Sequence, residues 1–394
     1  MTDPPIPVQL DHSSPRSKLR VLIVGGGVGA LEAALALRQL APEQTDVTVL
    51  APNEEFVYRP MTVGEPFGYA TAHRYPLAPI VAAAGAELRA GELDWVDRGE
   101  KLVHTAAGEE IAYDAMLLAV GARPRPRFSS AMTIDDHCLD ETLHGLIQDI
   151  EGGYVHSLAF VIPGRMAWPL PVYELALMSA GRAFDMNLAL EVTIVTPEDA
   201  PLAIFGTAAS DAVNARLAER GIRVVPSTYA EVPRSGEVEL RPGDRCVHAE
   251  RVIALPELFG PGVRGLHVAE HGFLRVGAYG LVPQAGPVFA AGDMTDFPIK
   301  HGGITAQQAD TAASSIAALS GAPIEPEKFQ PVIRGVLLTD DKPLYLTARV
   351  TGGAGFSSEV TENPPEPLPP KIAARYLAPY LEIQDRKGAA PALA

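Results

Sequence analysis

Short, almost wholly apolar runs alternate along the chain with longer segments in which alanine and leucine recur. Residues 20–24 (RVLIV) form one such run, an Ala- and Leu-rich stretch extends to about residue 40, and 47–50 is the next run. Strands that are covered on both faces of a parallel sheet have this continuous apolar character. The pattern therefore predicts a βαβ unit at the start of the folded chain.

The same alternation returns in the middle of the chain and indicates a second α/β unit over about 155–260. Its predicted strands and helices are strand 158–162, helix 172–184, strand 191–196, helix 207–220 and strand 222–225. Two further apolar strands, 115–120 and the one within 286–298, each break into a glycine turn. Strands alternating with helices predict an α/β fold with parallel sheets.

Residues beyond the alanine-rich helix predicted at 305–319 have a different character. Strand-like stretches occur at 332–338 and 344–350, the connector NPPEPLPP follows, and a terminal helix is predicted for KIAARYLAPYLEI at 371–383. Proline-rich connectors favour an extended, stiff conformation. We therefore expect a C-terminal α+β region with a terminal helix.

Composition excludes several classes of protein. Of 394 residues, 47% are hydrophobic and 20% charged, and the net charge is −16, which disfavours nucleic acid as a partner. No apolar run reaches the ~20 residues of a spanning helix, and the first residues lack the order of a signal peptide. These features predict a cytoplasmic protein. The two cysteines, Cys138 and Cys246, form no CxxC pair, and no metal site is predicted.

The loop GGGVGA at 25–30 is the first candidate for chemistry. Gly25, Gly27 and Ala30 satisfy the GxGxxG/A pattern between a strand and a helix, which is the context of a dinucleotide site. The free N–H groups at the start of the helix attract phosphate. The carboxylate expected after the second strand is replaced by Ala51 and Pro52, so Asn53 or Glu54 is the candidate for the ribose, unless both are solvated loop residues.

Two more stretches resemble flavoprotein segments. LLAVGARP at 117–124 resembles the strand-to-turn segment ATGARP, and VFAAGDMTDF resembles the signature whose aspartate faces the ribityl chain or the pyrophosphate. This resemblance assigns Gly121, Gly292 and Asp293 to FAD. Arg59, in EEFVYRPMTVGEPF, is a candidate phosphate contact or a surface ion-pair residue.

With these motifs, the chain resembles the two-dinucleotide-domain FAD-dependent pyridine nucleotide oxidoreductases, nearest to type II NADH:quinone dehydrogenases and sulfide:quinone oxidoreductases. The resemblance implies two Rossmann-like (FAD/NAD(P)-binding) domains of the glutathione-reductase type. It divides the chain into a flexible leader (1–18), an FAD-binding domain in two parts (19–150 and 271–325), an inserted NAD(P)-binding-like domain (151–270) and the C-terminal region (326–394). It also implies a quinone-like acceptor near the flavin, with FAD as cofactor.

Candidates for the redox end of the flavin come from the segment KHGGITAQQADTAA. It resembles the AQxxxQ helix start of type II dehydrogenases, although Thr311 replaces the final glutamine. Lys300, Thr305 and Gln307 are the residues that this resemblance assigns to catalysis. A helix that begins here directs its positive end toward the preceding space, whereas the alternative leaves Lys300 as a solvated loop residue.

The second nucleotide loop, PGRMAWPLPVY, is unusual. It contains one glycine, and its three prolines remove N–H donors that would hold a pyrophosphate. Gly164, Arg165 and Trp168 are its candidate pocket residues. Arg165 is a phosphate clamp that rescues NAD(P)H binding, and Trp168 together with Tyr173 forms either an aromatic wall over the flavin or core or interface anchors. The paired redox cysteines of sulfide:quinone enzymes have no counterpart at the family's positions.

The sequence thus predicts an FAD-dependent oxidoreductase and leaves its donor open. NAD(P)H or another small molecule gives electrons to the flavin, and a quinone-like or other small acceptor takes them. The alternatives are a flavin dehydrogenase or oxidase that does not use NAD(P)H, and a flavin-binding redox partner without turnover. A homodimer is left open. The terminal helix either contacts a membrane surface or, as its Pro379 and the acidic net charge favour, packs on the protein itself.

Overall fold

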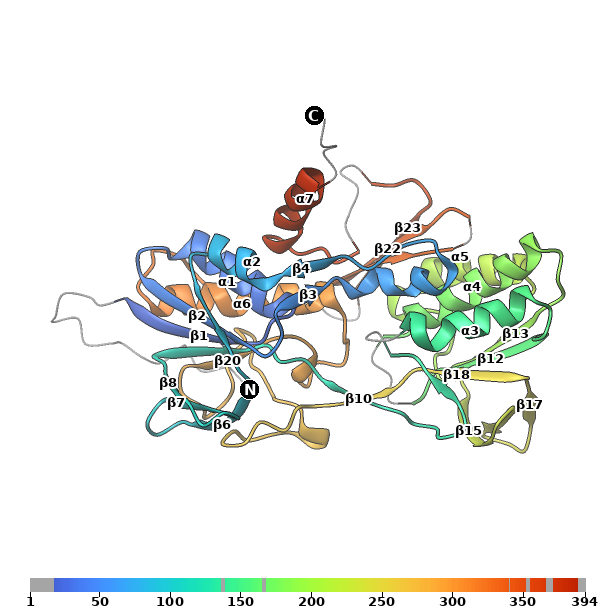
Figure 1. The fold of residues 1–394 in the computed structure, drawn as a ribbon, viewed down its shortest axis with the longest axis horizontal. Coiled ribbons are helices and arrows are strands. Elements are labelled where there is room, and N and C mark those ends of the chain that lie inside the picture. Colours follow the sequence, from blue (N-terminus) through green and yellow to red (C-terminus); the bar gives the residue numbers. More distant parts are fainter. Residues whose placement is uncertain are drawn as a thin grey trace.

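Two α/β units lie side by side along the long axis of the molecule, with a small sheet and a helix above them (Figure 1). The computed structural model describes residues 18–135, 139–164, 168–339, 341–351, 355–365 and 371–388. The leader up to residue 17, Cys138, Arg165 and residues 366–370 of the proline-rich connector lie outside these ranges. The prediction of an α/β fold with two Rossmann-like units is confirmed.

The first unit is built on a parallel sheet of order β20-β9-β1-β2-β5. These strands are β1 (Leu19–Val24), β2 (Thr45–Ala51), β5 (Glu87–Ala90), β9 (Ala115–Leu118) and β20 (Val288–Ala290). Helices α1 (Val28–Leu40) and α6 (Gly302–Leu319) pack against each other and share one core cluster with residues of β1, β2 and β9. Because β20 pairs with β9, two distant parts of the chain complete one sheet.

Smaller elements surround this sheet. An antiparallel sheet of β6 (Leu93–Asp97), β7 (Leu102–Thr105) and β8 (Glu110–Ala112) shares a second core cluster with it. The hairpin of β3 (Glu55–Val57) and β4 (Arg74–Pro76) encloses a 3-10 segment at Arg59–Phe67 and leads into α2 (Leu77–Ala83). The chain after β2 is thereby held beside the carboxyl ends of the parallel strands.

The second unit repeats the architecture, with strand order β11-β18-β12-β13-β14. Its strands are β11 (Met132–Thr133), β12 (Ser157–Val161), β13 (Glu191–Val195), β14 (Arg223–Val225) and β18 (Arg251–Ala254), and its helices are α3 (Leu139–Glu151), α4 (Leu170–Asp185) and α5 (Thr207–Glu219). A side sheet contains β15 (Tyr229–Arg234), β16 (Glu237–Arg241) and β17 (Cys246–His248). The antiparallel pair β10 (Arg123–Arg125) and β19 (Glu257–Phe259) carries the chain between the two units.

The C-terminal region packs against both units. Its antiparallel sheet contains β21 (Val332–Leu337), β22 (Leu344–Thr351) and β23 (Gly355–Thr361). This sheet contacts α4 and α5 of the second unit and α6 of the first. Gln307 fixes one contact, since its side-chain amide donates to the carbonyl of Val332 at 2.9 Å and accepts from the Val332 N–H at 2.8 Å.

The terminal helix begins later than the sequence predicted. Helix α7 spans Leu377–Gly388, whereas the prediction gave 371–383. The reason is Pro379, which is tolerated in the first turn but clashes with the carbonyl four residues earlier, so the helix cannot extend back through Arg375. Leu377 and Leu381 are buried in the core cluster that contains α1, so the apolar stripe packs on the protein's own body.

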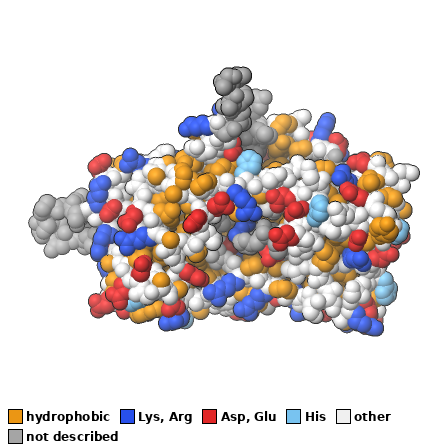
Figure 2. Space-filling view, in the orientation of Figure 1, with side chains coloured by type: hydrophobic (Ala, Val, Ile, Leu, Met, Phe, Trp, Pro, Cys, Tyr) orange, Lys and Arg blue, Asp and Glu red, His pale blue; other side chains and the backbone are white. Residues whose placement is uncertain are grey.

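Two properties of the described residues concern possible contacts with membranes: the distribution of surface charge and the hydropathy of the helices. Acidic and basic side chains are intermingled on the face shown in Figure 2, rather than gathered in areas of one sign. None of the helices among the described residues combines the length and apolar content that crossing a bilayer requires.

A buried carboxylate anchors the start of α7. Glu32, on α1, is fully buried and accepts hydrogen bonds from the N–H groups of Arg375 (2.5 Å), Tyr376 (2.9 Å) and Leu377 (2.6 Å). Asp310, on α6, interacts with Glu32, and burial followed by the Glu32 charge raises the pKa of Asp310 to about 8. Burial also raises the pKa of Glu32. The pair therefore retains a proton at neutral pH, and Glu32 can accept three N–H bonds as a carboxylate.

This pair predicts a stability that falls as the pH rises. Because the pKa of Asp310 is higher in the folded protein, its contribution is complete in acid and is lost as the pH rises toward about 8. Asp310→Asn keeps the shape without the titration. Its free energy of unfolding, measured in urea, should fall less between about pH 6 and about pH 9 than that of the wild type, by about 2–3 kcal/mol.

Asp46→Asn, which removes an exposed carboxyl group of the same unit, is the control and should retain the wild-type pH dependence. Identical pH profiles for the wild type and Asp310→Asn would contradict the shared proton.

Candidate functional site

One cavity of about 1120 Å³ connects the first glycine loop with the C-terminal region. Its wall is formed by the loop after β1, the chain after β2, the turns after β9 and β20, the start of α4, and residues of β21 and the segment before α7. Single small-molecule pockets usually measure about 300–1,000 Å³. The cavity is therefore larger than a typical single small-molecule pocket, as an extended dinucleotide cofactor requires.

The glycine loop approaches its neighbours closely on one side and is open on the other. Gly25 has φ +132°, and a Cβ there would lie 2.3 Å from the carbonyl oxygen of Ala119, so only glycine fits. Gly27 is the N-cap of α1 and has φ −95°; no side chain caps the helix, and a Cβ at Gly27 would meet nothing within 4 Å. Ala30 is fully buried, in the position of close helix–sheet packing. The first N–H groups of α1 are thus available to a phosphate.

The other residues assigned to FAD lie along the same cavity. Gly121 and Gly292, both with positive φ, and Asn53, Arg59 and Asp293 contribute to its wall. The N–H of Gly292 donates to the side chain of Gln308 at 2.7 Å, and a Cβ at Gly292 would lie 2.7 Å from Thr305. Uncapped N–H groups, an arginine and glycine-lined walls fit an ADP-containing flavin, so the residues present fit FAD.

Two of the three residues predicted at the redox end line the cavity. Lys300 and Thr305 do so; Gln307 does not, because its amide is used by Val332 and by the carbonyl of Gly303. The Lys300 ammonium donates to the carbonyl of Thr295 and lies 4.2 Å from the centre of the Phe273 ring. Burial lowers the pKa of Lys300 to about 8, against the opposing effect of Asp293 and Asp296. Gln307 therefore joins α6 to β21 and does not face the cavity. Its neighbour Gln308 accepts from the N–H of Gly292 and supports that turn.

The second nucleotide position keeps the strand–turn–helix frame, but prolines replace N–H donors in the part of its loop that the structure describes. Helix α4 starts with Pro169 as N-cap and has Pro171 in its first turn. Gly164 does not line the cavity, and a Cβ there would lie 2.7 Å from the ring of Tyr229. Arg165 lies outside the described residues. Trp168 contributes to the cavity wall.

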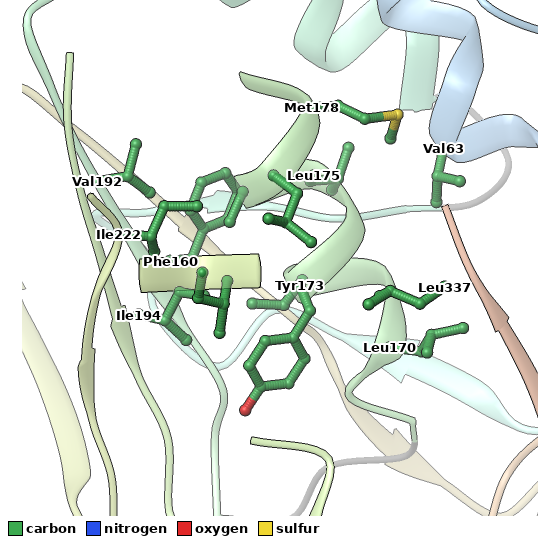
Figure 3. Close-up of a cluster of buried hydrophobic side chains, with 14 of the residues drawn as sticks. Val63, Phe160, Leu170, Tyr173, Leu175, Met178, Val192, Ile194, Ile222 and Leu337 are labelled. Carbon is green, nitrogen blue, oxygen red and sulfur yellow. The ribbon is translucent and has the colours of Figure 1, made fainter. Parts of the chain in front are cut away.

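The carboxylate beyond β13 is used inside the protein. Tyr173, fully buried on α4, donates to Glu198 at 2.7 Å, and Thr196 donates to the same oxygen at 3.1 Å. Burial is the main cause of the raised pKa of Glu198. Figure 3 shows the Tyr173 ring below α4, between Leu170 and Leu337 on one side and Ile194 and Phe160 on the other. A ribose carboxylate of the usual kind is therefore absent from this position among the described residues.

Charged and aromatic side chains meet where α4, α6 and the segment before α7 come together. Lys371 donates to Glu174 at 2.7 Å and to the carbonyl of Pro60 at 3.1 Å; both side chains of this ion pair are buried. The N–H of Leu338 also donates to Glu174, at 2.8 Å. Burial raises the pKa of Glu174, and Lys371 opposes the rise. Glu174 was not among the predicted site residues, although a lone carboxylate within an apolar helix is a signal of such a partner.

Comparisons with known proteins agree with this architecture. Residues 19–145 match the model of the pyridine nucleotide-disulphide oxidoreductase family. A sulfide-quinone reductase of Aquifex aeolicus (strain VF5) is 25% identical over 260 residues, which are 62% of this chain and 59% of that protein. The match therefore spans less than two thirds of the length of this relative.

Solved structures of the same fold cover more of the chain. The sulfide:quinone oxidoreductase of the hyperthermophilic bacterium Aquifex aeolicus has a TM-score of 0.76 and 19% identity, covering 94% of this chain and 90% of that chain. An NAD-dependent persulfide reductase from A. fulgidus has a TM-score of 0.60 and 18% identity, covering 85% and 64%. The fold is thus that of the two-dinucleotide-domain FAD oxidoreductases, and the resemblance recognised in the sequence is confirmed.

The open space beyond Gly27 leads to a prediction for cofactor binding. Gly27→Ala should fold normally, because its φ suits alanine and nothing lies within 4 Å of the added Cβ. The methyl group would occupy the space in which the pyrophosphate approaches the backbone, so FAD should bind about tenfold more weakly. Calorimetric titration of the apoprotein with FAD measures this change.

Gly145→Ala is the matched control, since it adds a methyl group to α3 where nothing lies within 4 Å and the residue does not line the cavity. Equal FAD affinity in both variants would show that the loop does not hold the pyrophosphate.

The buried ion pair leads to a prediction for stability. Glu174→Gln leaves the Lys371 ammonium buried without its counter-ion and should lower the free energy of unfolding by about 3–5 kcal/mol. The double variant Glu174→Leu/Lys371→Met removes both charges and should recover much of this loss. Urea unfolding of the three proteins measures the effect, and equal losses in the single and double variants would contradict it.

Proposed function

We propose that the protein is an FAD-dependent oxidoreductase that accepts electrons from a small donor other than NAD(P)H and passes them to a quinone-like small acceptor. The observation that carries this proposal is the contrast between the two nucleotide positions. The first opens into a continuous cavity that extends to Trp168 and Lys371, whereas at the second the Tyr229 ring lies against Gly164 and Glu198 accepts hydrogen bonds from Tyr173 and Thr196.

The flavin supplies the electron-transfer chemistry when bound, and the chain's residues orient and surround it. Lys300 and Thr305 lie at the start of α6, whose amino end carries partial positive charge. This partial charge stabilises a negatively charged group that lies beside the amino end of the helix. Since burial lowers the pKa of Lys300 to about 8, the contribution of its ammonium should decline in mildly alkaline solution.

Three features argue against NAD(P)H as the donor. Prolines occupy the start of α4, the Tyr229 ring packs on Gly164, and Glu198 is satisfied by Tyr173 and Thr196. The matched family residues, 19–145, end within α3, before β12 and α4 of the second nucleotide position. A NAD(P)H-dependent reductase with Arg165 as the phosphate clamp is the alternative that the experiment below tests.

The acceptor is inferred from the relatives, of which two are named for sulfide and quinone. Sulfide as the donor receives less support from the residues. Cys246 lies on β17, away from the cavity wall, and Cys138 lies outside the described residues. A quinone-like acceptor requires an apolar, aromatic-lined space, which the Trp168 end of the cavity provides.

Anaerobic mixing of the FAD-loaded protein with candidate donors tests this function. We expect NADH and NADPH to leave the flavin absorbance unchanged over minutes, because the described residues of the second nucleotide position offer few N–H donors and no free ribose carboxylate. Protein reduced chemically with dithionite, then freed of excess reductant, should recover its colour when a soluble quinone is added. Rapid bleaching by NADH would establish the NAD(P)H alternative, and failure of every quinone to restore the colour would remove the proposed acceptor.

A further inference from the structure

Two aromatic rings from different units lie in contact and form part of the cavity wall. Trp168 precedes α4 and His301 precedes α6; their ring centres are 4.4 Å apart and their planes are inclined by 37°. Trp168 also contacts the edge of Phe205, at 5.7 Å between ring centres. Both Trp168 and His301 line the cavity. Trp168, which lies between β12 and α4 of the second unit, thus adds an aromatic surface to the cavity that begins at the first glycine loop.

The hydrogen bonding of His301 determines where its proton lies. Its Nδ1 accepts from the N–H of Gly303 at 3.2 Å and caps α6. A ring nitrogen that accepts carries no proton, so the proton of the neutral ring lies on Nε2. Burial, with a smaller effect of Lys371, lowers the pKa of His301 to about 4. At neutral pH the residue is therefore an uncharged hydrogen-bond donor.

The Nε2–H of His301 remains available to a ligand. Across the ranges that the structure describes, no protein acceptor bonds to this nitrogen. The ring is held in place by its bond to Gly303 and by the Trp168 face. Buried polar groups of proteins are normally satisfied by protein, water or ligand. A donor held in a cavity wall without a protein partner is therefore open to water or to a ligand with an acceptor atom.

The surroundings favour a flat, uncharged molecule. Lys371, the cation whose charge acts on His301, is paired with Glu174 and the carbonyl of Pro60. Leu170, Pro171 and Val336 add apolar surface to the same cavity. An aromatic face, apolar walls and one oriented neutral donor suit a planar ring that carries a carbonyl oxygen.

We propose that a quinone-class carbonyl compound lies against Trp168 and accepts a hydrogen bond from Nε2–H of His301 at one carbonyl oxygen. This inference rests on the proposed function and names the residues that select its acceptor. His301 holds the oxygen without transferring its proton, so it determines binding and specificity.

Ligand binding to the FAD-loaded protein tests the proposal without requiring turnover. The chain contains two tryptophans, so Trp95→Phe leaves Trp168 as the single emitter, and its quenching reports binding. The probes are menadione and a dimethylnaphthalene that has methyl groups in place of the two carbonyl oxygens. Menadione should bind more tightly by about tenfold, which corresponds to one hydrogen bond of ~1 kcal/mol or slightly more.

His301→Ser in the same background separates the donor from the helix cap. Serine is a favourable N-cap and retains an oxygen for the Gly303 N–H, but it lacks the Nε2–H. Menadione should then bind about tenfold more weakly, dimethylnaphthalene should bind as before, and FAD content and melting temperature should stay unchanged. His144→Ser, which removes an exposed histidine of α3 away from the cavity, should change neither affinity.

The outcomes separate this inference from the proposed function. Absence of menadione binding, equal binding of the two probes, or unchanged menadione affinity in His301→Ser would each overturn the inference. If menadione binds as expected but does not restore the colour of the reduced flavin, the proposed function fails and the binding site stands. If it restores the colour and His301→Ser has no effect on affinity, the function stands and the site does not.

Discussion

The start of α1 imposes the constraint on which the site depends. Gly25 approaches the carbonyl of Ala119 so closely that β1, the turn after β9 and the helix start form one rigid edge, and the uncapped N–H groups at Gly27 then face the cavity. Unsatisfied N–H groups at a helix start are costly unless solvent or a ligand meets them. The sheet order brings the ends of β2, β9 and β20 beside this edge. The segments that follow these strands therefore line the same wall, with Asn53, Arg59, Gly121 and Gly292.

Two buried carboxylates join the C-terminal region to this site. Glu32 of the first unit caps α7, and Glu174 of the second unit pairs with Lys371 and the N–H of Leu338. Both are in helices that are otherwise mostly apolar where they are buried, and both would be unfavourable without these partners. The segment before α7 therefore closes one end of the cavity because hydrogen bonds to both units hold it there. Such bonds fix a geometry more strictly than apolar packing alone.

The second unit keeps the strand–turn–helix frame of a nucleotide-binding unit around its own core. Strands β12 and β13 and helix α4 form a well-packed core, in which Phe160, Ile194 and Tyr173 are buried (Figure 3). The same helix that would support a pyrophosphate here presents Tyr173 to Glu198 and Glu174 to Lys371. Packing maintains the architecture, while prolines occupy the start of α4 and internal hydrogen bonds engage Tyr173 and Glu198. Trp168 then becomes part of the wall of the remaining cavity.

The sequence by itself determined the α/β class, the two parallel units and the glycine loop, because apolar runs and the spacing of Gly25, Gly27 and Ala30 are local signals. The start predicted for the terminal helix was too early. The apolar stripe continues through residues 372–380, but Pro379 clashes with the carbonyl of Arg375 and prevents the helix from including it. Tertiary structure alone decided that Gln307 faces β21, that Glu198 is consumed by Tyr173, and that His301, Trp168 and Lys371 meet. These residues lie on separate elements, and their contacts arise only when the two units and the C-terminal segment pack together.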